Sequence, residues 1–518
     1  MTDHTDSTPA TSTPATPEDA AVLILQADGL AALESGDAAQ AVSLLSQAVA
    51  LRPDDAALRA DLGLAFERQQ DNESAKAAYG MAVALDPDNP IHRFNLGAAC
   101  QRLGQGHEAA THYLDALERE PMLAEAYFNL ATLFQEAGHL DIAEQHYRNA
   151  LEARPSYVEA AANLGLVLRR LGRLDEALDY LRATAEAQPD LAQTHSNLGL
   201  VLNEAGQYQE ALAVFDHLAA LRPFEVAPHV GRAGALRGLG HLAEAATAIR
   251  QALNRPETTI SAELEAAQIA AALQASGNGA AARSLVDAWR TAGVTPILRH
   301  TEAALGLAPP PPRADSAYLE QMYDAQAAML TEQAVAAATA ALSPTLAATL
   351  ARHLGPAAGT LQVLEIDCGV GALGPLLKPY ATDLVGVHPS ATAVQAAARS
   401  GLYDQLVHGD HAVVLERSAA NANLIVSTDI ANHVGDLGPL ASAAADALLP
   451  GGTLVLVLDA AEPWAPAVAL KENGRYLHRR DHVEGALRQA GLAVLEGTTL
   501  PPAIPGGTER LLVVARKG

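Results

Sequence analysis

The sequence predicts an α-solenoid of helical hairpins followed by a separate α/β domain. Prolines recur every 34 residues from Pro53 to Pro223, which is typical of arrays of helical hairpins. From about residue 360, apolar strand-like runs alternate with helical segments, which indicates a mostly parallel sheet covered by helices. Four consecutive prolines, residues 309–312, lie between the two patterns.

The composition favours an acidic, helix-rich protein with a substantial core. Hydrophobic residues make up 49% of the 518 residues, whereas aromatic residues make up only 4%. The formal net charge is -26. Nucleic acids and anionic membranes both attract basic surfaces, so the acidic balance disfavours both kinds of partner. We therefore expect neither a nucleic acid nor a membrane as partner.

The two cysteines, Cys100 and Cys368, lie in different parts of the chain and outside any CxxC-like spacing. The sequence therefore predicts neither a disulfide framework nor a metal site. Residues 1–19 are rich in Thr, Ser, Pro and Asp and lack the pattern of a signal peptide, so we expect a disordered tail. No apolar stretch reaches the length of about 18 residues that a membrane span needs. A cytoplasmic protein is the expectation.

Four columns of residues share the 34-residue period. One proline ends each second helix, because proline cannot continue a helix; these prolines are Pro53, Pro87, Pro121, Pro155, Pro189, Pro223 and, one residue early, Pro256. A small residue marks the close approach of two helices at Gly29, Gly63, Gly97, Ala131, Gly165, Gly199 and Ala233. A turn column, suited to a left-handed helix end, contains Gly36, Gln70, Gly104, Gly138, Gly172, Gly206 and Gly240. An alanine column on the second helix contains Ala41, Ala75, Ala109, Ala143, Ala177, Ala211 and Ala245.

These columns resemble the tetratricopeptide repeat, most clearly in residues 121–155, PMLAEAYFNLATLFQEAGHLDIAEQHYRNALEARP. The resemblance covers residues 20–256 and implies seven hairpins stacked into a solenoid. Residues 257–296 contain a weaker helix pair that we expect to cap the stack. Solenoids of this kind act through their concave surfaces, so the resemblance implies a protein or peptide partner.

A polar column lies two residues before the small residue of the first helix. It consists of Asp61, Asn95, Asn129, Asn163 and Asn197. In this family the position follows the concave surface, where carboxamides can donate to and accept from an extended peptide backbone. A structural ladder that only bridges neighbouring helices explains the same column. The sequence leaves both interpretations open.

A Pro-rich linker, residues 297–315, precedes the predicted α/β domain, residues 316–518. We expect the prolines to hold the linker in a stiff, extended form. Strand-like runs in the domain are TLQVLEID, DLVGV, NLIVSTDI, TLVLVLD and ERLLVVAR. Because ligands of parallel sheets bind at the carboxyl ends of the strands, we expect the functional residues there.

A glycine-rich turn, EIDCGVG (residues 365–371), follows the first strand. Such a turn lets the backbone approach a ligand closely. With LVHGD near the third strand and LLPGG before the fifth, it resembles the class I S-adenosylmethionine-dependent methyltransferases, which have a Rossmann-like fold. The resemblance covers residues 316–518. This segment is similar to the methyltransferase domains that are fused behind tetratricopeptide repeats. Those domains contain stretches like its GLYDQLV, GDLGPL and GRYLH.

The resemblance implies S-adenosylmethionine as cofactor. It places Glu365, Gly369 and Gly371 at the methionine part of the cofactor and Asp410 at the adenine. Asp429, after the fourth strand, is a further candidate for contact with the cofactor. Residues 323–329, YDAQAAM, match part of an aromatic-rich lid of the family.

Two positions depart from the family pattern. Asp367 replaces the first glycine of the turn, and His388 replaces the acid that binds the ribose hydroxyls. Asp367 either opposes the methionine carboxylate or pairs with the cofactor's ammonium group. A neutral imidazole offers one acceptor and one donor where an acid accepts two hydrogen bonds.

No catalytic residue is identified from the sequence. Methyl transfer needs mainly the alignment of the methyl group with a nucleophile, and a base only where the acceptor must lose a proton. Tyr476 and His478, which we expect in loops, are weak candidates for such a base.

Two hypotheses about function follow. The first is a methyltransferase that recruits a protein substrate or partner through its solenoid. The second is a non-catalytic adaptor whose methyltransferase domain is degenerate, as Asp367 and His388 suggest. A dehydrogenase is disfavoured, because the turn lacks GxGxxG spacing and His388 stands where an acid is needed.

Overall fold

The computed structural model describes residues 16–255, 258–329, 332–417, 421–502 and 507–518. The contacts within the chain divide it into two compact units, Met1–Val167 and Leu168–Gly518, which are described separately. Pro256, the last periodic proline, and residues 1–15 of the expected tail lie outside the described residues.

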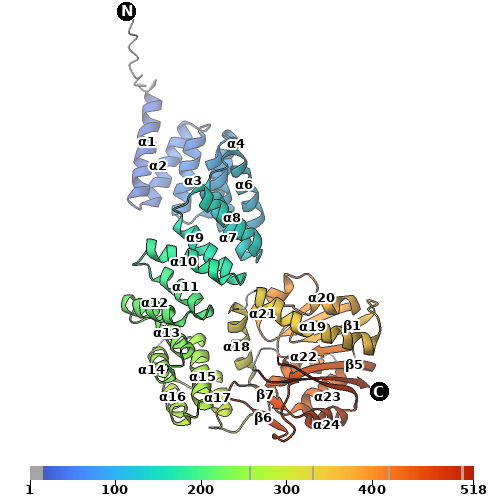
Figure 1. The fold of residues 1–518 in the computed structure, drawn as a ribbon. Helices are drawn as coiled ribbons and strands as arrows, with labels where there is room; N and C mark the ends of the chain where they lie inside the picture. The colour runs from blue at the N-terminus through green and yellow to red at the C-terminus, as the bar shows by residue number, and fades with distance from the viewer. Residues whose placement is uncertain (1–15, 256–257, 330–331, 418–420, 503–506) are drawn as a thin grey trace, which may run out of the picture. The chain divides into compact units, whose positions relative to one another are not determined.

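The first unit is an array of helical hairpins, drawn in blue to cyan in Figure 1. Its helices are α1 (Pro17–Glu34), α2 (Ala38–Leu51), α3 (Ala56–Arg68), α4 (Asn72–Leu85), α5 (Pro90–Arg102), α6 (Gly106–Arg119), α7 (Ala124–Glu136) and α8 (Leu140–Ala153). The division between the units falls inside the next helix, α9 (Val158–Arg170).

The turn of each hairpin has a left-handed residue at the predicted column. The glycines of this column have φ values of 73° to 85°, and Gln70 adopts the same conformation at 64° without being a glycine. The following aspartates then cap the second helix, since Asp37 accepts from the Gln40 amide and Asp71 from the Ser74 amide. Side-chain caps of this kind therefore mark the start of the second helix in the first two hairpins.

The small residues of the first helix make room for a large side chain of the second. A Cβ added to Gly63 would lie 2.7 Å from the ring of Tyr79, and one added to Gly97 would lie 2.9 Å from that of Tyr113. Every residue of the alanine column is fully buried. The periodic columns are therefore the packing positions of the hairpins.

The second unit begins with further hairpins. Its helices are α10 (Leu174–Ala187), α11 (Ala192–Glu204), α12 (Tyr208–Leu221), α13 (Val226–Gly238), α14 (Leu242–Leu253), α15 (Ile260–Ala275), α16 (Gly279–Ala292) and α17 (Pro296–Ala304). Two helices, α18 (Ser316–Met329) and α19 (Glu332–Leu354), lead from these hairpins into the α/β domain.

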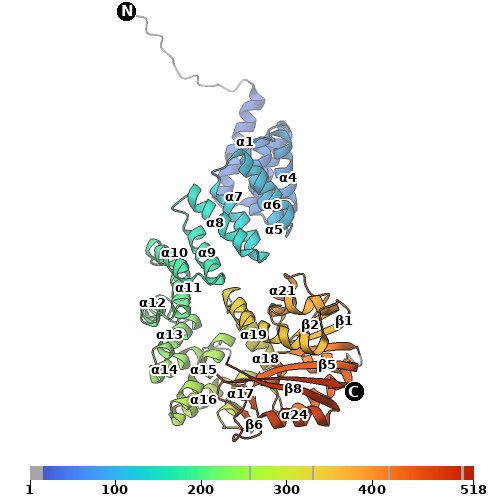
Figure 2. The same cartoon turned by 45° about the vertical axis from the view of Figure 1, so that its right-hand side comes forward.

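The α/β domain is built on a seven-stranded sheet in the order β3-β2-β1-β4-β5-β9-β8 (Figure 2). The strands are β1 (Leu361–Ile366), β2 (Ala381–His388), β3 (Gln405–His408), β4 (Ala422–Ser427), β5 (Leu448–Asp459), β8 (Leu492–Leu500) and β9 (Arg510–Lys517). Strands β1 to β5 are parallel, and β9 is antiparallel to both of its neighbours. A separate hairpin pairs β6 (Val468–Leu470) with β7 (Tyr476–His478).

Helices bury both faces of this sheet. They are α20 (Gly374–Leu377), α21 (Ala391–Ala398), α22 (His411–Arg417), α23 (Leu437–Ala447), α24 (Arg480–Gln489) and the preceding α19, with 3-10 turns at Lys378–Tyr380 and Ile430–His433. Alternate strand residues face opposite sides: Leu364 and Ile425 pack with α22, α23 and α24, whereas Val363 and Leu424 pack with α19 and α20. An α-solenoid followed by an α/β domain, the predicted fold class, is confirmed.

The proline-rich segment is hydrogen-bonded to the α/β domain. The Pro312 carbonyl accepts from the amides of Gly435 and Asp436 at 2.8 and 2.9 Å. The Ala314 amide donates to the His433 carbonyl at 2.8 Å. Residues 297–315 were expected to form a stiff spacer. Their first part lies in helix α17, and their last part is hydrogen-bonded to residues 433–436 of the α/β domain.

Candidate functional site

The strand order changes direction between β1 and β4. Strands β2 and β3 follow on one side of β1, whereas β4 and β5 lie on the other. Ile366 at the end of β1 pairs with Ser427 at the end of β4. Open α/β sheets bind their ligands outside the carboxyl ends of the strands at such a switch point. Side chains that follow these two strands therefore define the candidate site.

The glycine-rich turn lies at this switch point. Gly369 and Gly371 have φ values of 53° and 88°. A Cβ on Gly371 would lie 3.2 Å from the Cα of Ala397, so helix α21 passes too close for any side chain there. The amides of Asp367 and Cys368 both donate to the Val387 carbonyl of β2, which fixes the start of the turn.

Asp367 also has a left-handed conformation, with φ of 67°. Its Oδ2 accepts from the Ser427 hydroxyl at 3.2 Å and from the Ile430 amide at 2.5 Å. Its Oδ1 is buried and has no hydrogen-bond partner, and the residue is only 9% exposed. Burial and the nearby charge of Asp429 raise the pKa of Asp367 well above its ordinary value. The neutral form of this carboxyl group is therefore favoured, and a cation placed beside it would favour the ionised form.

Glu365 is buried at the end of β1 and is 2% exposed. It accepts a hydrogen bond of 2.7 Å from the hydroxyl of Tyr403. Burial raises the pKa of Glu365 to about 7. The carboxyl group expected at the methionine part of a cofactor is therefore bound to a tyrosine of its own domain.

His388 lies at the end of β2 and is 3% exposed. Its Nδ1 accepts from the Ser390 amide at 3.1 Å, so the neutral ring carries its proton on Nε2. Burial lowers the pKa of His388 to about 4, which keeps the ring neutral. The ring of Tyr323, from α18, meets that of His388 edge-on at 4.7 Å.

Helix α18 contributes two side chains to the site. The Tyr323 hydroxyl donates to Asp429 Oδ2 at 2.6 Å. Asp324 Oδ1 accepts from the Ser390 hydroxyl at 2.5 Å and from the Thr392 amide at 3.2 Å. The segment whose sequence partly matches a lid therefore contacts the ends of β2 and β4.

Asp410, after β3, is paired with the proline-rich segment. Arg313 donates to it at 2.6 and 3.2 Å, and the Ser316 hydroxyl donates as well. Burial raises the pKa of Asp410, but these hydrogen bonds outweigh it and bring the pKa to about 2. The acid expected at the adenine is thus ionised and already has a cationic partner.

Asp429, after β4, joins a charged network with Arg475 and Asp459. Arg475 donates to Asp429 Oδ1 and to Asp459 Oδ2, each at 2.7 Å. Asn432 donates to Asp429 at 2.9 Å and accepts from the Asp459 amide at 2.6 Å. Burial raises the pKa of Asp429, but Arg475 and His433 outweigh it and hold the pKa well below its ordinary value.

Tyr476 and His478 lie in strand β7, not in loops as expected. The Tyr476 hydroxyl donates to the Pro311 carbonyl. His478 is fully buried, and its Nε2 lies 3.1 Å from the Ala431 carbonyl. Both side chains contact backbone carbonyls in this structure.

The polar column of the solenoid makes contacts between helices. Asn129 donates to the Tyr113 hydroxyl at 3.1 Å, and Asn163 donates to that of Tyr147 at 3.3 Å. In each case the tyrosine belongs to the preceding hairpin. Within the column, Asp61 accepts from Gln26 of the preceding hairpin, whereas Asn197 accepts from Gln193 of its own helix. The contacts of Asp61, Asn129 and Asn163 join neighbouring hairpins, as those of a structural ladder do.

Arg313, Ser316 and Asp459 are among the members of the site that sequence reasoning did not predict. Asp459 is the last residue of the fifth strand. The expectation that polar residues at strand ends carry function, applied to every strand, would have found it. Arg313 and Ser316 carry no such signal, because only the fold brings the proline-rich segment to β3.

Comparisons with known families agree with this architecture. Tetratricopeptide-repeat models match residues 32–100 and 128–192, and a model described as a methyltransferase domain matches residues 334–496. The chain therefore contains tetratricopeptide repeats and a C-terminal methyltransferase-family domain. The methyltransferase match includes the glycine-rich turn and the ends of β1 to β5.

Solved structures resemble part of the chain at low identity. A tetratricopeptide-repeat protein, YrrB, "with an unusual peptide-binding site", is 22% identical, with 36% of this chain and 95% of YrrB covered and a TM-score of 0.32. PilF of Pseudomonas aeruginosa is 20% identical, covering 41% and 97%, with a TM-score of 0.38. MamA of Desulfovibrio magneticus is 17% identical, covering 32% and 94%, with a TM-score of 0.30. No curated protein matches the sequence. Among the described residues, no helix is long and apolar enough to cross a membrane.

Proposed function

We propose that the methyltransferase domain binds S-adenosylmethionine at the switch point and methylates a protein recruited by the solenoid. The observation that carries this proposal is the unpartnered, buried Oδ1 of Asp367 beside Gly369 and Gly371. A buried acceptor without a partner costs free energy, and such sites are often completed by a ligand. An ammonium group supplies the hydrogen-bond donor and the positive charge that Asp367 lacks.

The other residues of the site fit the proposal in part. The positive φ of Gly369 and Gly371 suits glycine, which has no side chain to come between the backbone of the turn and a ligand. His388 offers an Nε2 proton to a hydroxyl oxygen, in place of the acid that would accept two hydrogen bonds. Glu365, at the start of the turn, is held by a hydrogen bond from the Tyr403 hydroxyl. The bound cofactor supplies a methyl group on a sulfonium, which an acceptor nucleophile takes.

Around this turn, the residues of the chain bind and orient charge. Arg475 neutralises Asp429 and Asp459 and so leaves Asp367 as the acid without a cation among these three. Tyr323 covers His388 and holds Asp429 through its hydroxyl. Both contacts bring helix α18 over the ends of β2 and β4. Exclusion of water strengthens the electrostatic interactions of a bound ligand.

The solenoid supplies the means of recruitment in this proposal. Tetratricopeptide hairpins are present on both sides of the division between the units. The carboxamides of the polar column, Asn95, Asn129, Asn163 and Asn197 with Asp61, are the proposed contacts for an extended peptide. Asn129 and Asn163 each use an amide donor on a neighbouring tyrosine, which leaves the carbonyl oxygen as the group to bind a peptide.

A non-catalytic adaptor is the second candidate, and one observation favours it. Asp410 is bound by Arg313 and Ser316, so the acid proposed for the adenine already has its partners. If those contacts persist, the domain folds without a cofactor and the protein acts through its solenoid alone.

A methyl-transfer assay separates the two candidates. Proteins retained by the immobilised full chain are incubated with methyl-labelled S-adenosylmethionine and the chain. The enzyme hypothesis predicts label in a retained protein, and none when Gly371→Ala replaces the wild-type chain. Retention without label, at any cofactor concentration, supports the adaptor. Gly485→Ala, a substitution with no atom within 4 Å of the added Cβ, is the matched control and should label as wild type does.

A further inference from the structure

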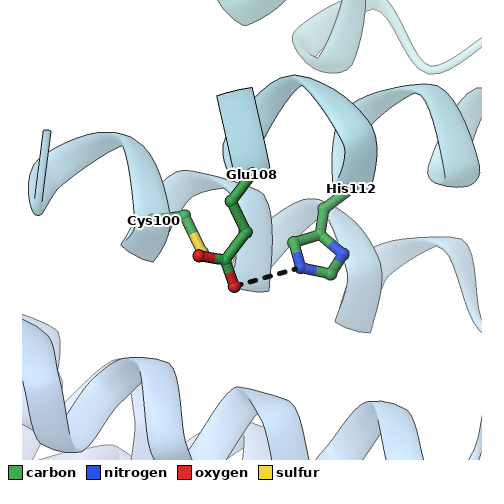
Figure 3. A group of neighbouring side chains, drawn as sticks. All are labelled: Cys100, Glu108 and His112. Carbon is green, nitrogen blue, oxygen red and sulfur yellow. Dashed lines mark ion pairs between the residues drawn. The ribbon is translucent and has the colours of Figure 1, made fainter. Parts of the chain in front are cut away.

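A thiol, a carboxylate and an imidazole converge within the third hairpin of the solenoid (Figure 3). Cys100 lies on α5 and is fully buried, whereas Glu108 and His112 lie one turn apart on α6. One donor atom from each residue lies within 4.8 Å of the other two. It is the one group of this kind among the residues that the structure describes.

Cys100 and Glu108 share a hydrogen bond, whereas Glu108 and His112 lie beyond hydrogen-bond distance. His112 Nε2 lies 3.9 Å from Glu108 Oε1, which is too long for a hydrogen bond. Two ligand atoms that each lie about 2.0–2.3 Å from one ion can be separated by this distance. The other ring nitrogen of His112, Nδ1, is buried without a hydrogen-bond partner. The imidazole is therefore not held in place by hydrogen bonds of its own.

Lys76 holds Glu108 without occupying the oxygen that faces His112. Its ammonium donates to Glu108 Oε2 at 2.8 Å and to Gln105 Oε1 at 2.7 Å. Oε1 remains directed toward His112.

The next hairpin provides an internal comparison, because its residues lie 34 positions further on. There the thiol position is Phe134, the carboxylate position is Ile142 and the imidazole is again present as His146. The rings of Phe134 and His146 stack at 5.5 Å. A histidine at this position is thus compatible with apolar packing alone, whereas the third hairpin surrounds it with two further metal-binding groups.

We propose that Cys100, Glu108 and His112 bind a zinc ion. A thiolate, an imidazole and a carboxylate are the ligands that Zn²⁺ prefers, and three protein ligands leave a fourth position for water. The side chain of Glu108 is 45% exposed, so the fourth position faces solvent. The Cys100 thiol loses its proton to solvent when the ion binds, because the thiolate is the ligand. Short-range ligand spacings such as CxxC do not reveal this group, because its ligands come from two helices of one hairpin.

Cobalt titration of the full chain, reduced and freed of metal by a chelator, tests the proposal. Co²⁺ on this site produces a thiolate-to-metal charge-transfer band and the intense visible bands of a tetrahedral ion, at one ion per chain, and Zn²⁺ abolishes them. Cys100→Ser removes the charge-transfer band. His112→Ala weakens Zn²⁺ binding by more than about tenfold.

Two matched controls make the result decisive. His146→Ala, in the corresponding position of the next hairpin, leaves the bands and the affinity unchanged, as does Cys368→Ser. Circular dichroism verifies that each variant is folded. Absence of the charge-transfer band in the wild-type chain, or its persistence in both Cys100→Ser and His112→Ala, overturns the proposal.

Discussion

Gln70 in the solenoid and Asp367 in the methyltransferase domain share one backbone conformation in very different surroundings. They are the two non-glycine residues with positive φ among those that the structure describes, at 64° and 67°. Gln70 is exposed in a hairpin turn, and its neighbours set the turn through local hydrogen bonds. Asp367 is 9% exposed, and its side chain is held by Ser427 at the end of β4 and by Ile430 in the turn that follows.

The difference separates tolerated strain from strain at a site. A left-handed residue other than glycine costs about 1–2 kcal/mol. At Gln70 the strained conformation serves no evident purpose, because six other hairpins have glycine at the same position. At Asp367 the same conformation places a carboxylate oxygen, buried and unpartnered, at the switch point of the sheet. Strain that positions an unsatisfied group indicates function more strongly than strain alone.

The largest effect on stability is expected at Arg475, which pairs with Asp429 and Asp459 near the turn that contains Asp367. Arg475→Met leaves the carboxylates of Asp429 and Asp459 without their cation and should destabilise the methyltransferase domain by about 3 kcal/mol. Hydrogen exchange of peptides from β1 and β4 measures the change. Arg352→Met is the matched control: its ion pair with Glu496 is 60% exposed on the arginine side, so we expect a loss below about 1 kcal/mol. Equal losses of stability in the two variants would show that the network of Arg475, Asp429 and Asp459 does not stabilise the domain more than an exposed ion pair does.

The second largest effect is expected at Gly371, the last glycine of the turn. Gly371→Ala introduces a Cβ 3.2 Å from the Ala397 backbone at a φ of 88°, so the domain should lose about 2 kcal/mol of stability. Thermal unfolding by calorimetry measures the loss. Gly485→Ala in α24, with nothing near its added Cβ, should be neutral or stabilising. A neutral Gly371→Ala would mean that the turn is not as closely packed as described.

Asp367→Asn tests whether the unpartnered oxygen needs its charge. The folded pKa of Asp367 lies above its unfolded value, so the wild-type domain loses stability relative to the variant as the pH rises from about 4. The variant should therefore be the more stable protein at pH 7 and equal to wild type near pH 4, as measured by urea unfolding. Binding of S-adenosylmethionine should weaken at least tenfold, or about 1.4 kcal/mol. A variant that is less stable at pH 7 contradicts the assigned burial of this carboxyl.

The smallest effect is expected in the solenoid. Gln70→Gly relieves the left-handed strain of an exposed turn, so it should stabilise the second hairpin by about 1 kcal/mol. Slower hydrogen exchange of α3 and α4 is the measurement. Gln70→Ala, which cannot relieve the strain, should leave the exchange unchanged. Similar exchange in the glycine variant and the wild type would show that the turn carries no strain.

The sequence predicted the solenoid in detail because one local geometry recurs along it. A glycine column, an alanine column and a proline column each have a physical cause that acts within a single hairpin. In the methyltransferase domain the strands, the turn and the acids at the strand ends were predictable in the same way. The fold confirms that part of the prediction.

The partners of those acids were not predictable, because they depend on tertiary structure. Arg313 meets Asp410 across 97 residues of chain, and Arg475 meets Asp429 across 46. Neither pair has a spacing or motif that identifies it. Tyr476 was expected in a loop but lies in strand β7, which pairs with β6. The strand was not predicted because this short hairpin lacks an apolar run of typical length.

Titration calorimetry of the full chain with S-adenosylmethionine tests the central claim most directly. The account predicts one site with micromolar affinity, and ligand at 100 times the dissociation constant should add about 2.7 kcal/mol to the stability of the methyltransferase domain. Asp367→Asn provides the comparison at the same site and should bind at least tenfold more weakly. No heat of binding with ligand up to the millimolar range, from a chain that circular dichroism shows to be folded, would contradict the account and leave the adaptor.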